Sequence, residues 1–161
     1  MEIERKFLAD PGSLKLTDYS SIEMKQGYLF TDPVLRIRKE NDSYVLTVKS
    51  VGLLQREEYE LPLSKEQFTK MAESVQGCFI EKTRYLIPCP PYTIELDIFH
   101  GALKGLVYAE VEFPNVEEAK AFLPPSWFLR EVTDDGSFSN AALSRLSGDA
   151  LHCFLQENAL H

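Results

Sequence analysis

The chain has 161 residues and a formal net charge of −8. Its length suits one domain with a hydrophobic core of its own, so we expect a single domain over residues 1–161. The excess of acidic residues argues against a broad electrostatic grip on a phosphate backbone, and we expect no duplex nucleic acid as a partner.

Cysteine usage and hydropathy indicate the compartment. Cys78, Cys89 and Cys153 are odd in number and lack C-x-x-C spacing, which favours free thiols over a disulfide set or a zinc site. The chain shows no charged-then-apolar leader, and no run approaches the roughly 20 apolar residues that a membrane-spanning helix needs. We therefore expect a cytoplasmic protein with no membrane partner, present as a monomer or homodimer.

The first strand, residues 1–8, alternates charged and apolar side chains. Glu2, Glu4 and Lys6 share one face, and Ile3 and Phe7 share the other. Five more charged pairs recur at the same period of two: Arg36 with Arg38, Glu58 with Glu60, Lys82 with Arg84, Glu95 with Asp97, and Glu110 with Glu112. One such pair would indicate only a solvated sheet face, but the recurrence indicates a common charged surface.

Further elements follow along the chain. Helical spacing over 16–24 predicts a short helix, and 26–29 opens an extended piece. Strands are expected at 34–40, 44–50, 55–62, 79–87, 92–99, 106–113 and 127–133, which makes about eight with the first. Helices are expected from Ser64 to Gly77, from Asn115 to Phe122, and from Asn140 into the tail with a break at Gly148.

The apolar residues that alternate with the charged ones indicate which face of the strands points into a barrel. Eight strands can close around an apolar core with the charges outside, or around a charged channel covered by helices. Amphipathic helices lie between the strands, and Ile3, Phe7, Val111 and Phe113 need a cover. We therefore predict an α+β, mostly β fold: a closed eight-stranded antiparallel barrel, or tunnel, with a charged interior, covered outside by helices.

The charged interior favours a phosphate ligand and a metal. Its bases are Lys6, Arg36, Arg38, Lys49, Arg56, Lys82 and Arg84, and its acids are Glu2, Glu4, Glu58, Glu60, Glu95, Asp97, Glu110 and Glu112. Burying so many ions costs several kcal/mol each unless they pair or hold a ligand, so function explains them better than stability does. Arginine and lysine bind phosphate oxygens, and carboxylates without histidine or thiolate suit Mg²⁺ or Mn²⁺.

An ordered set of motifs resembles a known family. It consists of Glu2-x-Glu4-x-Lys6, Arg36-x-Arg38, Thr47-Val48-Lys49, Arg56-x-Glu58-x-Glu60, Lys82-Thr83-Arg84-Tyr85, Glu95-Leu96-Asp97 and Glu110-Val111-Glu112. In this order, over nearly the whole chain, it resembles the CYTH superfamily, also called triphosphate tunnel metalloenzymes. The short bacterial inorganic tripolyphosphatases are the most similar members. The resemblance implies a metal-dependent hydrolase that cleaves the terminal phosphate of inorganic triphosphate.

The resemblance also implies roles for individual residues. Glu2 and Glu4 with Glu112 and Glu110 are expected to bind the essential Mg²⁺ or Mn²⁺, and Glu58, Glu60 and Glu110 a second ion. The predicted substrate-binding residues are Lys6, Arg36, Arg38, Lys49, Arg56, Lys82 and Arg84. Two general bases stay open: water activated by the ion with help from a carboxylate, or a lysine of lowered pKa, Lys49 or Lys82, paired with Tyr28. Tyr28 has an alternative role as a packing residue.

Other functions stay open as well. A class IV-type adenylate cyclase, a thiamine triphosphatase or an RNA 5′-end enzyme would need an apolar pocket for the organic part of its substrate, and the aromatic residues of the sequence define none. A non-catalytic polyphosphate or nucleotide-binding module would keep the bases and lose the metal ligands. Because the acids are present, the sequence favours an enzyme over such a module and over a plain sheet protein with a solvated charged face.

Overall fold

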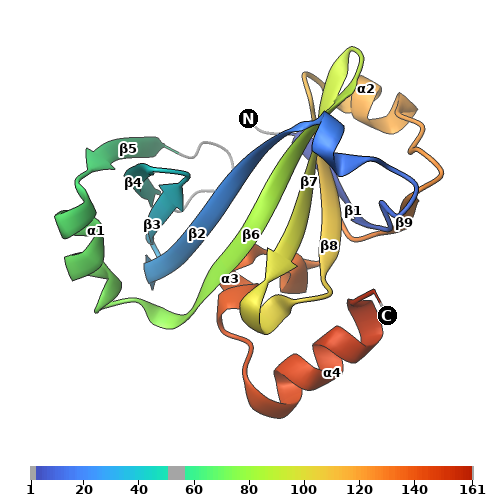
Figure 1. The fold of residues 1–161 in the computed structure, drawn as a ribbon. Coiled ribbons are helices and arrows are strands. Elements are labelled where there is room, and N and C mark those ends of the chain that lie inside the picture. The colour runs from blue at the N-terminus through green and yellow to red at the C-terminus, as the bar shows by residue number, and fades with distance from the viewer. Residues whose placement is uncertain (1–2, 51–56, 161) are drawn as a thin grey trace.

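The computed structural model describes residues 3–50 and 57–160 and consists mainly of one antiparallel sheet (Figure 1). In the described residues, the nine strands lie in the order β5-β4-β3-β2-β6-β7-β8-β1-β9. They are β1 Ile3–Ala9, β2 Ser20–Thr31, β3 Val34–Glu40, β4 Ser43–Lys49, β5 Glu58–Leu63, β6 Gln76–Cys89, β7 Tyr92–His100, β8 Val107–Phe113 and β9 Phe128–Glu131.

The described helices are short. They are α1 Lys65–Ala72, α2 Val116–Ala121, α3 Asn140–Ser144 and α4 Gly148–Asn158, with 3-10 turns at Leu16–Asp18 (η1), Gly101–Leu103 (η2) and Gly136–Phe138 (η3). The predicted caps are confirmed: Ser64 forms a capping box with Gln67, and Asn115 accepts from the backbone N–H of Glu118. None of the helices described is long and apolar enough to cross a membrane.

Two predicted helices differ from the structure. The segment 16–24 contains the 3-10 turn η1 in place of a longer helix, and β2 already begins at Ser20. Pairing of β2 with β3 and β6 overrides the local helical spacing. The helix after Ser64 ends at Ala72, and Gly77 lies inside β6 with a φ of 71°. A Cβ atom at Gly77 would lie 2.4 Å from the carbonyl oxygen of Ser144. Gly77 is therefore a point of close backbone approach.

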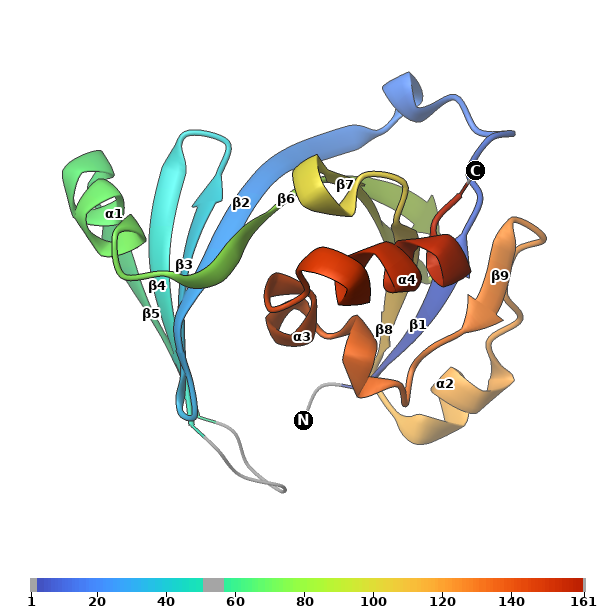
Figure 2. The same ribbon diagram turned by 90° about the horizontal axis from the view of Figure 1, so that it is seen from below.

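The prediction of a closed eight-stranded barrel is wrong. The sheet curves strongly but stays open (Figure 2), and in the described part of the chain its edge strands β5 and β9 share no ladder. Closure requires every strand to have a neighbour about 4.8 Å away on each side. Here the C-terminal part of the chain occupies the concave side instead: α3 contacts β2 and β6, and Phe138 and Leu143 are buried there.

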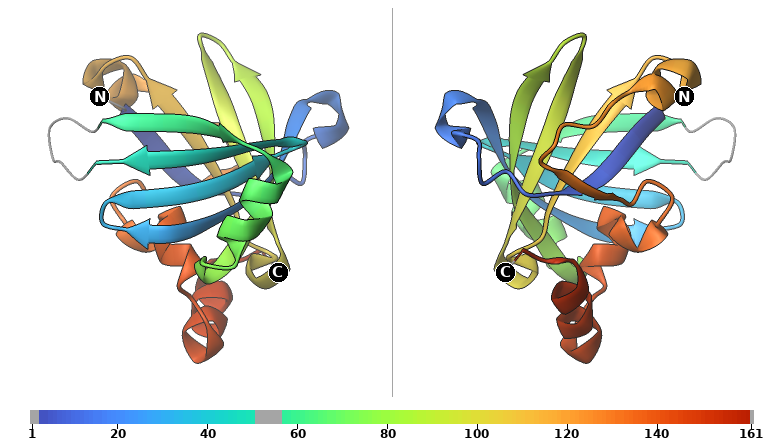
Figure 3. Two further views of the ribbon diagram at one scale, coloured as in Figure 1. Left: turned by 90° about the vertical axis from the view of Figure 1, so that its left-hand side faces the viewer. Right: turned by 90° about the vertical axis from the view of Figure 1, so that its right-hand side faces the viewer.

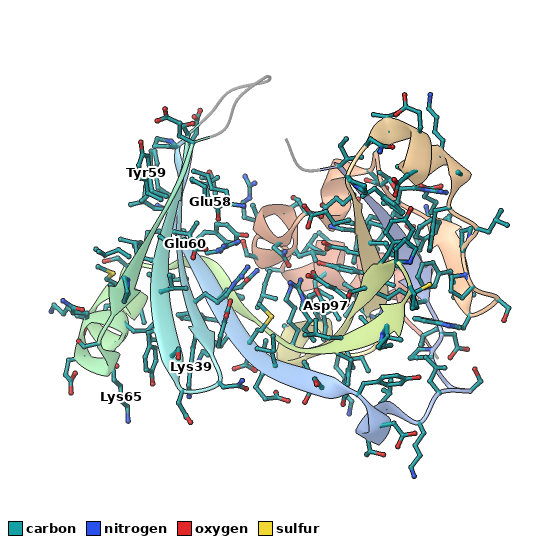
Figure 4. The ribbon with its side chains drawn as sticks, turned by 90° about the horizontal axis from the view of Figure 1, so that it is seen from above. Lys39, Glu58, Tyr59, Glu60, Lys65 and Asp97 are labelled. Carbon is teal, nitrogen blue, oxygen red and sulfur yellow. The ribbon has the colours of Figure 1, made fainter. Side chains whose placement is uncertain are left out.

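The predicted charged surface is confirmed as one face of this sheet. Directly opposed residues of antiparallel strands point to the same side. Register therefore links the described charged positions across the sheet: Glu4 with Glu112, Lys6 with Glu110, Glu110 with Glu95, Asp97 with Arg84, and Lys49 with Glu58. Figure 4 shows Glu58 and Glu60 pointing from β5 toward the opposite arm of the sheet, where Asp97 lies, whereas Tyr59 points away. The charged face is therefore the concave one.

The convex face carries the expected apolar cover. Phe7, Val111 and Phe113 form a buried cluster with Ala119 and Phe122, which belong to α2 and the residue after it. On the other arm of the sheet, α1 packs by its one buried residue, Phe68, with the Tyr44 ring 5.0 Å away between centroids. Two of the helices thus cover the sheet from outside, as predicted.

The other two helices, α3 and α4, lie at one end of the sheet, opposite α2 (Figure 3). A second apolar cluster lies at this end and includes Leu8, Ile80, Phe99, Tyr108, Phe138 and Leu143. Leu8 and Ile80 share the face of Lys6 and Lys82, two residues away along their strands. The concave face therefore has an apolar part filled by the C-terminal segment, and a charged part.

Candidate active site

Four glutamates from three strands line one cavity. Glu4 of β1, Glu95 of β7, and Glu110 and Glu112 of β8 lie around a volume of about 590 Å³. The register explains the grouping, because Glu4 is opposite Glu112 and Glu95 is opposite Glu110. The pKa of Glu95 is raised, mainly by burial and also by Glu110, although Arg84 opposes the shift. We call this the acidic cavity.

Two predicted phosphate-binding cations border the acidic cavity. Lys6 Nζ lies 3.3 Å from Glu110 Oε1, and Arg84 Nη1 lies 2.9 Å from Glu95 Oε2. Lys6 is held further by the carbonyl oxygen of Phe138 at 3.3 Å and lies 4.7 Å from the ring centre of Tyr108. Positive and negative groups therefore alternate over a few ångströms on this part of the concave face.

Asp97 anchors two cations at the centre of the sheet. Lys82 Nζ donates to Asp97 Oδ2 at 2.8 Å, and Arg84 donates to both carboxylate oxygens at 2.8 and 2.9 Å. The side chains of Lys82 and Asp97 are fully buried. Burial alone would raise the pKa of Asp97, but Lys82 and Arg84 hold it below its ordinary value. Asp97 is therefore ionised and fixes both cations in place.

Burial acts in the opposite sense on the lysine of this cluster. The pKa of Lys82 is lowered, first by burial and then by Arg84, although Asp97 raises it. Asn140 of α3 also accepts a hydrogen bond from Lys82 Nζ, at 3.4 Å, and another from Tyr108 Oη, at 3.3 Å. Sequence periodicity could not place Asn140 here, because α3 reaches the concave face only through the tertiary fold.

Strands β2, β3 and β4 form the other charged region, which we call the arginine wall: Gln26, Tyr28, Arg36, Arg38 and Thr47. Arg38 Nε donates to Gln26 Oε1 at 2.8 Å, and Arg36 Nη2 donates to Thr47 Oγ1 at 3.3 Å. Burial lowers the pKa of Arg38, as do the charges of Arg36 and Arg84, although Glu40 opposes them. Burial raises the pKa of Tyr28, so its phenol is protonated. Gln26 was absent from the predicted site.

The remaining predicted residues are spread more widely. Lys49 Nζ lies 4.0 Å from Glu58 Oε1 between β4 and β5. Of the residues that the structure describes, those lining the acidic cavity include neither Glu58 nor Glu60, so these two are not brought together with Glu110. Glu2 and Arg56 lie outside the described residues.

The metal prediction depends on the acidic cavity. Within residues 3–50 and 57–160, no three His, Cys, Asp or Glu side chains are already arranged so that they could hold a metal ion. The cavity nevertheless offers carboxylate oxygens from Glu4, Glu110 and Glu112, with Glu95 beside them. Hard oxygen donors are the ligands that Mg²⁺ and Mn²⁺ prefer, so the chemistry of this donor set fits such an ion.

Comparison with known proteins shows similarity to inorganic triphosphatases. An inorganic triphosphatase of Nitrosomonas europaea is 41% identical over 147 residues, which cover 89% of this chain and 96% of the relative. One of Acetivibrio thermocellus is 38% identical, covering 88% and 92%. The crystal structure of the inorganic triphosphatase NE1496 superposes with a TM-score of 0.74 at 38% identity, covering 92% and 97%. The sequence profile of the CYTH domain matches residues 1–128, and the chain belongs to this family.

Proposed function

We propose that this protein hydrolyses inorganic triphosphate, releasing its terminal phosphate in a reaction that depends on Mg²⁺ or Mn²⁺. One observation carries the proposal: the concave face holds an acidic cavity beside cations that are anchored in fixed positions by Asp97. A flexible chain of phosphates needs such distributed cations, and a metal needs such carboxylates. The relatives named as inorganic triphosphatases favour this substrate among triphosphates.

The residues divide into two groups by their charge. The cations would hold the phosphates: Lys6, Arg36, Arg38, Lys49, Arg56, Lys82 and Arg84. The acids Glu4, Glu110 and Glu112, with Glu2, would hold the divalent ion, which neutralises charge on the phosphoryl group when it is bound. Catalysis is then mainly positioning of the chain for in-line attack by water, together with stabilisation of the spreading negative charge.

For the proton acceptor we favour a carboxylate over a lysine. Lys82 has a lowered pKa, but its ammonium is enclosed and donates to Asp97, so it serves better as an anchored cation. Glu95 lines the acidic cavity, and its raised pKa brings it closer to the range in which a carboxylate accepts a proton efficiently. Glu95→Gln should therefore lower kcat more than it raises KM, whereas Lys82→Arg should mainly raise KM.

Phosphate release from inorganic triphosphate, ATP and thiamine triphosphate tests the function, each with Mg²⁺, with Mn²⁺ and with a chelator. We expect metal-dependent release from inorganic triphosphate that falls by about 100-fold or more in Glu4→Gln, because a charged ligand becomes neutral. Glu117→Gln is the matched control, since it makes the same chemical change on exposed α2. Faster phosphate release from ATP or thiamine triphosphate would make that compound the preferred substrate in place of inorganic triphosphate. Triphosphate that raises the melting temperature without being cleaved would indicate a binding module.

A further inference from the structure

Two buried donors of the arginine wall have no acceptor among the described residues. Gln26 is fully buried and Arg36 is 8% exposed. In the part of the chain that the structure describes, neither Gln26 Nε2 nor Arg36 Nε has a hydrogen-bond partner. Buried polar groups are nearly always paired in folded proteins, so two orphan donors on neighbouring strands indicate an acceptor that comes from outside the chain.

The orientation of the Gln26 amide follows from its neighbour. Arg38 Nε lies 2.8 Å from Gln26 Oε1, and a guanidinium can only donate. The amide oxygen must therefore face Arg38, which leaves both N–H groups of Nε2 directed elsewhere. The directly opposed residue on the other side, Ile80 of β6, is apolar and offers no acceptor. The orphan state of Nε2 is thus a consequence of the fold and cannot be removed by turning the amide over.

The electrostatic setting specifies the ligand. Arg36 and Arg84 lie close enough to Arg38 that their charges lower its pKa, after the effect of burial, although Glu40, 3.1 Å from Arg38, opposes them. A further cation at position 26 would add to this repulsion, whereas an amide adds a donor without a charge. A ligand that satisfies several N–H donors beside several arginines must carry many acceptor oxygens and negative charge, which describes a chain of phosphoryl groups.

We propose that Gln26 is a substrate-binding residue that acts at both ends of its amide. Nε2 donates to a phosphoryl oxygen of triphosphate, and Oε1 holds the Arg38 guanidinium against the same phosphate chain. This inference rests on the proposed function, because it assigns a further contact to the same substrate. It also explains why a neutral residue stands in the centre of a charged face.

The test is Gln26→Glu, which keeps an oxygen facing Arg38 and replaces the donor by a carboxylate oxygen. Binding of inorganic triphosphate is measured by calorimetry in chelator, and KM and kcat are measured with Mg²⁺. We expect Kd and KM to rise by about tenfold to a hundredfold, with the melting temperature unchanged or higher. Gln67→Glu is the matched control: it makes the same change in the α1 capping box, where Glu serves as well as Gln.

Each outcome decides the inference. Wild-type Kd and KM in Gln26→Glu would show that Gln26 only supports Arg38 and would overturn it. If Gln26→Glu fails to fold, Gln26→Met takes its place and removes both ends of the amide at once. A similar loss of triphosphate affinity is expected, and unchanged affinity would overturn the inference. Failure of the wild type to hydrolyse triphosphate would refute the proposed function alone. The inference is then decided by binding in chelator, and absence of wild-type binding there refutes it too.

Discussion

The acidic cavity and the arginine wall lie on one concave face and arise from the same alternation of charged residues, but they differ in pairing. Around the acidic cavity each described cation has a carboxylate partner: Lys6 with Glu110, Arg84 with Glu95 and Asp97, and Lys82 with Asp97. In the arginine wall, Arg38 contacts the neutral Gln26 and pairs with Glu40 at 3.1 Å, and Arg36 contacts the neutral Thr47. Among the described residues, two buried donors there are left without an acceptor. The same alternation of charged residues can thus produce one region whose described cations are all paired with carboxylates and another that keeps two unsatisfied buried donors.

The difference has an energetic consequence. A buried charge that loses its only partners destabilises the fold, whereas a buried donor that has no partner already costs free energy and can be removed at little further cost. Substitutions around the acidic cavity should therefore mainly lower stability, and substitutions in the arginine wall should mainly lower substrate affinity. Three variants separate these two kinds of sensitivity.

The largest effect is expected for Asp97→Asn in the paired region. The substitution leaves Lys82 without its carboxylate partner and Arg84 with Glu95 alone, and we expect a loss of about 3–5 kcal/mol in the free energy of unfolding, measured with urea. Glu131→Gln is the control, because Glu131 is also paired with an arginine, at 2.8 Å, but is 41% exposed on its side chain and lies against Arg5. Its loss should stay below about 1 kcal/mol. Equal losses of stability in Asp97→Asn and Glu131→Gln would contradict the idea that the buried pairs stabilise the fold more than the exposed one.

A smaller effect of the other kind is expected for Arg36→Met in the arginine wall. We expect KM for triphosphate to rise by about tenfold to a hundredfold, because charge-assisted hydrogen bonds to the phosphates are lost. The free energy of unfolding should change by less than about 1 kcal/mol, since an orphan donor is removed. Arg145→Met makes the same change on an exposed residue after α3 and should alter neither quantity. A large loss of stability with unchanged KM would reverse the roles of the two regions.

The smallest effect is expected in the pH dependence of stability in metal-free buffer. The pKa of Glu95 in the folded protein is raised, so the folded state binds more protons than the unfolded state just above pH 4.5. The contribution of Glu95 to stability is thus complete below its unfolded pKa and is lost as the pH rises through its folded pKa. Its side chain is 40% exposed, so solvent screening should keep the change below about 1 kcal/mol. Glu95→Gln should flatten this part of the curve, and a curve that is unchanged in the variant would assign the titration to another group.

Much of the site was predictable because alternation is a local property. The period of two placed Glu4, Lys6, Arg84, Asp97 and Glu110 on one face, and the register confirms it. The same reasoning missed Gln26, because a single amide within a strand has no periodic signal and resembles a core or surface position equally. Periodicity also counted Asp97 as one of eight acids and did not predict its pairing with Lys82 and Arg84. The partners of a carboxylate depend on which strands are neighbours in the sheet.

The sequence by itself determined the composition of the charged face, the apolar cover opposite it and the caps of α1 and α2, because each depends on residues a few positions apart. Only the tertiary structure decided that the described residues form nine strands in a sheet that stays open, that β1 lies between β8 and β9, and that α3 enters the concave side. Strand order, curvature and the place of a C-terminal helix depend on contacts between residues far apart in the chain. Such contacts also decide that the described cations around the acidic cavity are all paired with carboxylates, whereas two buried donors of the arginine wall have no partner among the described residues.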